Sequence, residues 1–130
     1  MWVLDTNTLI YFFKGEGRVA ETLFQHPPRD IAVPAIVAYE LQVGIAKSSS
    51  PKKRTRQLDE LLSTIAVIPF HQQEARAAAE VRAALEKRGT PIGPYDTLIA
   101  GTTLAHGATL VSRNTREFRR IKTLRVENWY

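Results

Sequence analysis

The stretch Val3-Leu4-Asp5-Thr6-Asn7 decides the fold, because an apolar strand runs there directly into residues that favour the start of a helix. Val3 and Leu4 predict a short buried strand. We expect Thr6 and Asn7 to cap the helix that follows, which leaves Asp5 at the carboxyl end of the strand. Ligands of open α/β sheets bind beyond this end of the strands. The opening residues therefore predict both a fold class and a site.

The rest of the chain continues the alternation of strands and helices. Apolar periodicity and turn residues predict further strands over residues 31–33, 65–68, 109–112 and 124–126. They predict helices over residues 8–13, 19–24, 35–47, 52–63, 72–88, 95–106 and 114–120. This order predicts an α/β sandwich with a mainly parallel central sheet flanked by helices. A length of 130 residues suits a single domain over residues 1–130.

Several classes of protein are excluded by what the sequence lacks. It has no cysteine, so disulfides and thiolate metal sites are absent, and the composition fits a cytoplasmic protein. We find no signal peptide and no apolar run long enough to span a bilayer, so no membrane association is expected. The three histidines are scattered, with no HExxH spacing, and no Walker-type loop is present.

The chain is basic, with a formal net charge of +5. That charge favours a polyanionic partner such as nucleic acid or an acidic protein. The cations gather in two clusters. One comprises Lys47, Lys52, Lys53, Arg54 and Arg56, and the other Arg113, Arg116, Arg119, Arg120, Lys122 and Arg125. Two solvated faces would explain the same pattern.

Three separated acids are candidates for chemistry: Asp5, Glu40 and Asp96. Each also has a structural explanation. Asp5 could cap a helix, Glu40 could cover apolar surface at the edge of a helix face, and Asp96 could favour the first turn of its helix. The functional hypothesis is that their carboxylates converge over the strand ends and share a cation. Mg²⁺ and Mn²⁺ prefer such oxygen ligands, and a bound metal supports phosphodiester hydrolysis.

Asn114 and Glu117 follow the strand that ends at Ser112. Asn114 is a natural N-cap residue, and Glu117 could pair with a neighbouring arginine. Either could instead provide a fourth ligand or orient water at the metal.

The motifs together resemble those of PIN-domain ribonucleases, and most closely the VapC-type toxins of bacterial toxin–antitoxin pairs. The resemblance covers essentially the whole chain. It rests on Asp5-Thr6-Asn7, Glu40-Leu41, the segment from Pro91 to Ala100 (PIGPYDTLIA), and the segment from Val111 to Phe118 (VSRNTREF).

This resemblance implies a PIN-like three-layer sandwich and a Mg²⁺-dependent endoribonuclease, in which Mn²⁺ could substitute. Asp5 and Asp96 would be the principal metal ligands. Glu40 would act on the metal or on its bound water, Ser112 would support Asp5, and Thr6, Asn7 and Asn114 would also support the site. Many family members have aspartate at the position of Asn114, which leaves Glu117 as the candidate fourth acid.

The family also implies partners. Its members pair with a VapB-type antitoxin, form homodimers and higher-order complexes, and in relatives of this style cleave tRNA in the anticodon stem-loop. We expect Arg113, Arg116 and Arg119 to bind RNA, and part of the surface around Tyr11, Phe12 and Phe13 to receive an antitoxin segment or a second copy of the chain.

Two alternatives remain at this stage. A phosphoaspartyl-forming phosphatase also has an aspartate after its first strand, but usually a second one two residues later, where this chain has Asn7. A non-catalytic PIN-like module that binds RNA or protein is the other. Loss of the acids would favour it, yet all three are present.

Overall fold

The computed structural model describes all of residues 1–130 and has a single five-stranded sheet at its centre. Its strands lie in the order β3-β2-β1-β4-β5, and every neighbouring pair is parallel. The strands are β1 (Trp2–Leu4), β2 (Ile31–Pro34), β3 (Ala66–Ile68), β4 (Thr109–Val111) and β5 (Arg125–Glu127). The expectation of a mainly parallel sheet is confirmed.

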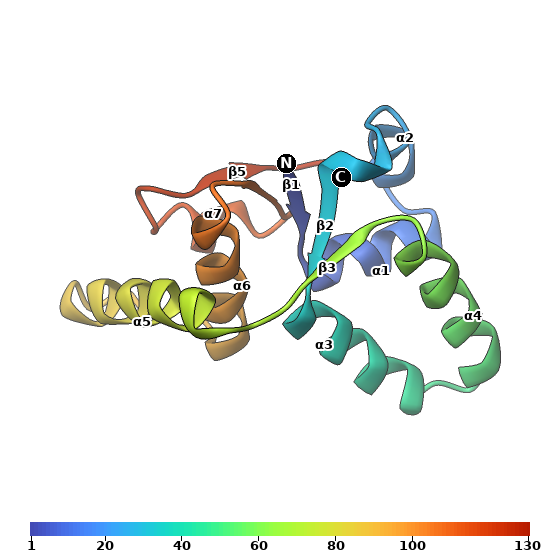
Figure 1. The fold of residues 1–130 in the computed structure, drawn as a ribbon, viewed down its shortest axis with the longest axis horizontal. Helices are drawn as coiled ribbons and strands as arrows, with labels where there is room; N and C mark the ends of the chain where they lie inside the picture. The colour runs from blue at the N-terminus through green and yellow to red at the C-terminus, as the bar shows by residue number, and fades with distance from the viewer.

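Helices connect the strands and flank the sheet. They are α1 (Thr6–Lys14), α2 (Val19–Leu23), η1 (Pro28–Asp30), α3 (Ala35–Ala46), α4 (Pro51–Leu62), α5 (Gln72–Lys87), α6 (Pro94–Ala105) and α7 (Thr115–Phe118). In Figure 1, α5 and α6 lie together on one side of the central strands, and α1, α3 and α4 gather on the other. None of these helices combines the length and hydrophobicity that a membrane span requires.

The central strands are apolar because both faces of the sheet are covered, as parallel sheets require. Val3 and Leu4 in β1 and Leu110 and Val111 in β4 are fully buried. Apolar residues from the flanking helices pack onto them, including Leu9 and Ile99. A continuous core thereby fixes the ends of β1 and β4, where the candidate site lies.

One detail of the predicted helix start is wrong. Asp5 itself, and not Thr6 or Asn7, is the N-cap of α1, and its side chain accepts a hydrogen bond from the Thr8 amide. The reason is that α1 begins at Thr6 with no intervening loop, so the cap position falls on the residue that ends the strand. Capping and a role in the site are therefore compatible for Asp5.

Helices α5 and α6 pack closely because Gly101 has no side chain. A Cβ atom at Gly101 would lie 2.4 Å from the Cα and 2.5 Å from the backbone nitrogen of Ala78 in α5. Backbone atoms cannot rotate away as a flexible side chain can. Gly101 therefore sets how near α5 comes to the helix that carries Asp96.

We predict that Gly101→Ala lowers the free energy of unfolding by at least about 2 kcal/mol, because the added methyl group overpacks a backbone contact. The matched control is Gly44→Ala. Gly44 lies within α3 with open space around its Cα, so alanine there should stabilise the protein by up to about 1 kcal/mol. Urea denaturation of both variants measures the two effects, and an unchanged midpoint for Gly101→Ala would contradict the prediction.

Candidate functional site

The candidate site lies where the strand order reverses. β1 pairs with β2 on one side and with β4 on the other, and Leu4 stands opposite Val111. The residues that follow, Asp5 and Ser112, therefore reach the same edge of the sheet. Such a reversal point at the carboxyl ends of parallel strands is where open α/β sheets bind ligands.

Asp5 is a buried carboxylate, with only 5% of the residue exposed. Its Oδ1 accepts the amide of Thr8 at 2.9 Å, and the Ser112 hydroxyl also bonds to the carboxylate. Burial raises the pKa of Asp5 above its ordinary value, although the hydrogen bonds from Ser112 and Thr8 oppose the rise. The hydrogen bonds thus hold this carboxylate in place but do not fully offset the cost of burying its negative charge.

Glu40 is tied to the end of β1 through Thr6. The Thr6 hydroxyl, in the first turn of α1, donates to Glu40 Oε1 at 2.6 Å across to α3. Asn7, which was also expected to support the site, is exposed and makes no side-chain hydrogen bond to these acids. The sequence-predicted support at this point therefore comes from Thr6.

Asp96 stands in the first turn of α6, as predicted, after Gly93 and Pro94. Its pKa is raised to about 6, first by burial and then by the negative charges of Asp5, Glu117 and Glu40. The four acids are therefore close enough to repel one another. None of them forms an ion pair with a cationic side chain.

The segment after β4 is organised by Ser112 and Asn114. Ser112 Oγ accepts the amide of Asn114 at 3.0 Å, and the Asn114 side-chain amide donates to Glu117 Oε2 at 3.1 Å. The interpretation that Glu117 pairs with a neighbouring arginine is wrong, because its partner is this neutral amide. Asn114 instead orients Glu117, whose charge reaches Asp96.

The C-terminal cations fall into two groups. Arg116 and Arg119 are exposed and form no ion pair. Others are engaged within the protein: the Arg113 guanidinium lies 3.6 Å from the centre of the Tyr130 ring, Arg120 donates to the Pro91 carbonyl, and Arg125 donates to the Gly107 carbonyl. Part of the basic cluster therefore stabilises the fold.

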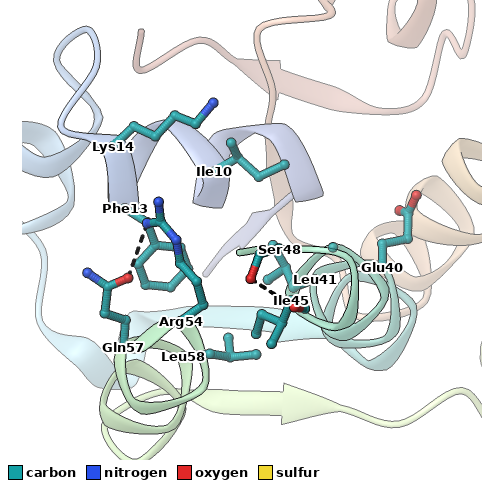
Figure 2. Close-up of a pocket in the computed structure, with 11 residues that line it drawn as sticks. Ile10, Phe13, Lys14, Glu40, Leu41, Ile45, Ser48, Arg54, Gln57 and Leu58 are labelled. Atoms are coloured by element: carbon teal, nitrogen blue, oxygen red, sulfur yellow. Dashed lines mark hydrogen bonds between the residues drawn. The ribbon is translucent and has the colours of Figure 1, made fainter. Parts of the chain in front are cut away.

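A groove of about 220 Å³ opens beside the site, between α1, α3 and α4. Figure 2 shows Glu40 at one end of it and Lys14, Phe13 and Arg54 at the other, with Ile10, Leu41, Ile45 and Leu58 between them. Of the aromatic residues expected at a partner surface, only Phe13 lines this groove. Tyr11 packs against Tyr130, and Phe12 packs against Phe13 and Phe24.

The acids fit a magnesium-type cation by donor chemistry and charge. All four side chains offer oxygen, and their mutual repulsion is relieved by a cation. No three acidic or histidine side chains lie close enough to hold an ion together. Because Mg²⁺ is usually bound through one or two carboxylates and several waters, two of these acids satisfy its needs.

Sequence reasoning missed three residues at this edge. Thr8 fixes Asp5 through its amide and also donates its hydroxyl to the Val111 carbonyl at 3.1 Å. Its position three residues after the N-cap was the available signal. Tyr39 and Tyr95 each precede an acid in the sequence, and their rings meet across α3 and α6.

Comparison with known proteins places this geometry in a family. The PIN domain family model matches residues 2–124. The chain belongs to the PIN-domain family. It is 34% identical to the tRNA(fMet)-specific endonuclease VapC of Salmonella typhimurium over 98% of this chain and 97% of that protein. It is 36% identical to ribonuclease VapC2 of Rickettsia felis, over 99% and 98% respectively.

Solved structures agree with this assignment. The VapBC2 complex of Rickettsia felis, bound to a promoter DNA fragment, contains a chain that superposes with a TM-score of 0.92 over 99% of this chain and 98% of its own. The DNA-bound VapBC of Salmonella typhimurium gives 0.92 at 34% identity, over the same shares of the two chains. The resemblance to VapC ribonucleases is confirmed, and this PIN domain is an endoribonuclease by family. The phosphatase alternative is thereby excluded.

We predict that Asp96→Asn stabilises the metal-free PIN domain above pH 6. A carboxylate with a raised folded-state pKa resists ionisation, so stability is lost as the pH rises from about 4, the ordinary pKa, through about 6. After allowance for solvent screening at this half-exposed side chain, the gain is about 1 kcal/mol at pH 7 and vanishes below pH 4.

Thermal unfolding in EDTA at pH 4 and pH 7 tests this prediction. Asp59→Asn, which removes an exposed acid from α4, is the matched control and should change neither value. A loss of stability at pH 7 in Asp96→Asn would show that the acids do not repel one another as the structure indicates.

Proposed function

We propose that this PIN domain is a Mg²⁺-dependent endoribonuclease, with Mn²⁺ as a possible substitute, and that it acts as the toxin of a VapBC-type pair. The observation that carries the proposal is the group of four acids at the β1–β4 edge, none of them paired with a cation. Asp5 is buried and the other three acids are partly exposed, so keeping these repelling carboxylates ionised together costs free energy without a ligand. A divalent cation and the phosphate that it attracts supply that ligand.

Asp5 and Asp96 would hold the cation, because both are fixed by the backbone around them. When bound, Mg²⁺ offsets negative charge on the phosphate and favours formation of a hydroxide nucleophile. Asp5 is locked by Thr8 and Ser112, and Asp96 by its place in the first turn of α6. These features hold both carboxylates at the carboxyl ends of β1 and β4.

Glu40 would handle the proton of the attacking water. Its Oε1 is occupied by the Thr6 hydroxyl, which leaves Oε2 free to accept that proton. Glu117, oriented by Asn114, adds negative charge near Asp96 and would favour the cation. In this assignment each acid has a distinct task.

We propose tRNA as the substrate, cut in the anticodon stem-loop. The support is the relative from Salmonella typhimurium, which is named for cleavage of tRNA(fMet). Arg116 and Arg119, both free of ion pairs, are suited to bind the RNA backbone. Arg113 is a weaker candidate, because its guanidinium already stacks on Tyr130.

We also propose a VapB-type antitoxin partner and a homodimer within a larger complex. Structural neighbours solved as VapBC complexes support the antitoxin. The groove between α1, α3 and α4 suits a segment with apolar residues, because five of its eleven lining residues are apolar and it reaches Glu40. A segment seated there would block the acids from one side.

We predict that the purified protein, freed of any antitoxin, cleaves tRNA in Mg²⁺ and that Asp5→Asn reduces the rate at least 100-fold. Asparagine still caps α1, so the fold should persist. Gel assays with and without EDTA, together with circular dichroism of the variant, make the test. Cleavage that survives EDTA would exclude the metal mechanism, and a folded, antitoxin-free protein that never cleaves RNA would favour a non-catalytic module.

We predict that Arg116→Ala with Arg119→Ala weakens RNA binding and flattens its dependence on salt. Each lost phosphate contact lowers the slope of log K against log salt by about 0.7 for single-stranded RNA, so the pair lowers it by about 1.4. Arg29→Ala is the control and should leave the slope unchanged, because Arg29 is exposed in η1 at the amino end of β2, away from the carboxyl ends of the strands. An unchanged slope for the double variant would assign these arginines to another surface.

A further inference from the structure

Two exposed tyrosines border the acids in a way that the proposed chemistry leaves unexplained. Tyr39 is 51% exposed and Tyr95 is 44% exposed. Tyr39 directly precedes Glu40 in α3, and Tyr95 directly precedes Asp96 in α6. The other exposed aromatic residues, Phe24 and Tyr130, have no such neighbour.

The two rings form one surface that bridges α3 and α6. Their centroids are 5.8 Å apart with the planes tilted by 54°, and the two hydroxyl oxygens lie 3.5 Å apart. At this separation the rings already touch, so no third ring fits between them. The outer faces are the surfaces that remain open to a ligand.

The position of the pair indicates what the ligand is. Consecutive Cα atoms are about 3.8 Å apart, so each ring starts from a point within one nucleotide's length of a neighbouring acid. The pKa of Tyr95 is raised by the hydrogen bond with Tyr39 and also by the negative charge of Glu40, so a phosphate placed at the acids would have an adjacent base within reach of the tyrosines. Aromatic rings beside a phosphate-binding site are the usual means of holding an unpaired base.

We propose that Tyr39 and Tyr95 form a stacking platform for an unpaired nucleobase next to the phosphate that is cleaved. The inference rests on the proposed function, since it takes the acids as the place of cleavage. It adds a requirement on the substrate: the base beside the cut must be free of the helical stack, so loops are preferred to duplexes. The platform positions the RNA and takes no part in bond breaking.

Binding of a short single-stranded RNA that carries 2-aminopurine tests the proposal without any need for cleavage. The Asp5→Asn protein in Mg²⁺ serves as the parent, because this substitution is expected to slow cleavage at least 100-fold while a cation can still offset the charge of the remaining acids. The double variant Tyr39→Leu with Tyr95→Leu keeps apolar bulk but loses the aromatic faces. The double variant with Phe at both positions keeps the faces and loses the hydroxyls. Phe24→Leu, at the end of α2, is the matched control.

We expect the leucine pair to weaken binding about 5- to 50-fold and to abolish the quenching of 2-aminopurine that stacking causes. The phenylalanine pair should bind within about twofold of the parent, and Phe24→Leu should not differ from it. Thermal unfolding of each variant checks that the fold is retained.

Four results would overturn the proposal. The first is that the parent does not bind the RNA. The second is that the leucine pair binds as tightly as the parent. The third is that the phenylalanine pair binds as weakly as the leucine pair, which would assign the role to the hydroxyls. The fourth is that the leucine pair leaves RNA binding unchanged and alters only the molecular mass of the protein in solution, measured by light scattering. That result would make this face a contact between copies of the chain. Failure of the unsubstituted protein to cleave RNA is a separate result, which bears on the proposed function alone.

Discussion

The buried carboxylate of Asp5 is the constraint on which the rest of the site depends. A charged group that is 5% exposed loses most of its hydration, and the hydrogen bonds from Thr8 and Ser112 recover only part of that loss, because its pKa still lies above the ordinary value. The parallel pairing of β1 with β4 imposes this burial, since Asp5 and Ser112 follow paired residues. The fold therefore places a buried carboxylate at the carboxyl ends of β1 and β4 without a cationic side chain to pair with it.

The other acids add negative charge near Asp5. Asp96, Glu40 and Glu117 come from three different helices, yet each is held by a local contact or a helix start near Asp5. The protein has a net charge of +5, but none of its cations pairs with these four acids. The cationic side chains therefore remain free to attract a polyanion, and they do not neutralise the acids. A mobile divalent cation neutralises the acids without occupying those side chains.

The sequence was sufficient for the architecture because short apolar runs mark the central strands and turn and capping residues mark the helix boundaries, and the parallel sheet follows from their alternation. It also indicated Asp5 and Asp96 through their places at a strand end and a helix start. What it could not predict were contacts between segments far apart in the chain. The bond from Thr6 to Glu40 spans 34 positions, and the meeting of Tyr39 with Tyr95 spans 56. An arginine was considered as the partner of Glu117 because composition cannot show that Asn114, whose amide bonds to the Ser112 hydroxyl, reaches Glu117 instead.

Glu40 connects the acids with the groove between α1, α3 and α4. One face of this residue lines the groove, while its carboxylate is bonded to Thr6 at the end of β1. A chain seated in the groove therefore contacts Glu40 without any rearrangement of the sheet. Lys14 and Arg54 at the far end favour an acidic group on such a chain, and the acids near Glu40 favour a basic one. A single bound segment with apolar residues between opposite charges would match the groove along its whole length and cover the acids, so recognition and inhibition need no separate surfaces.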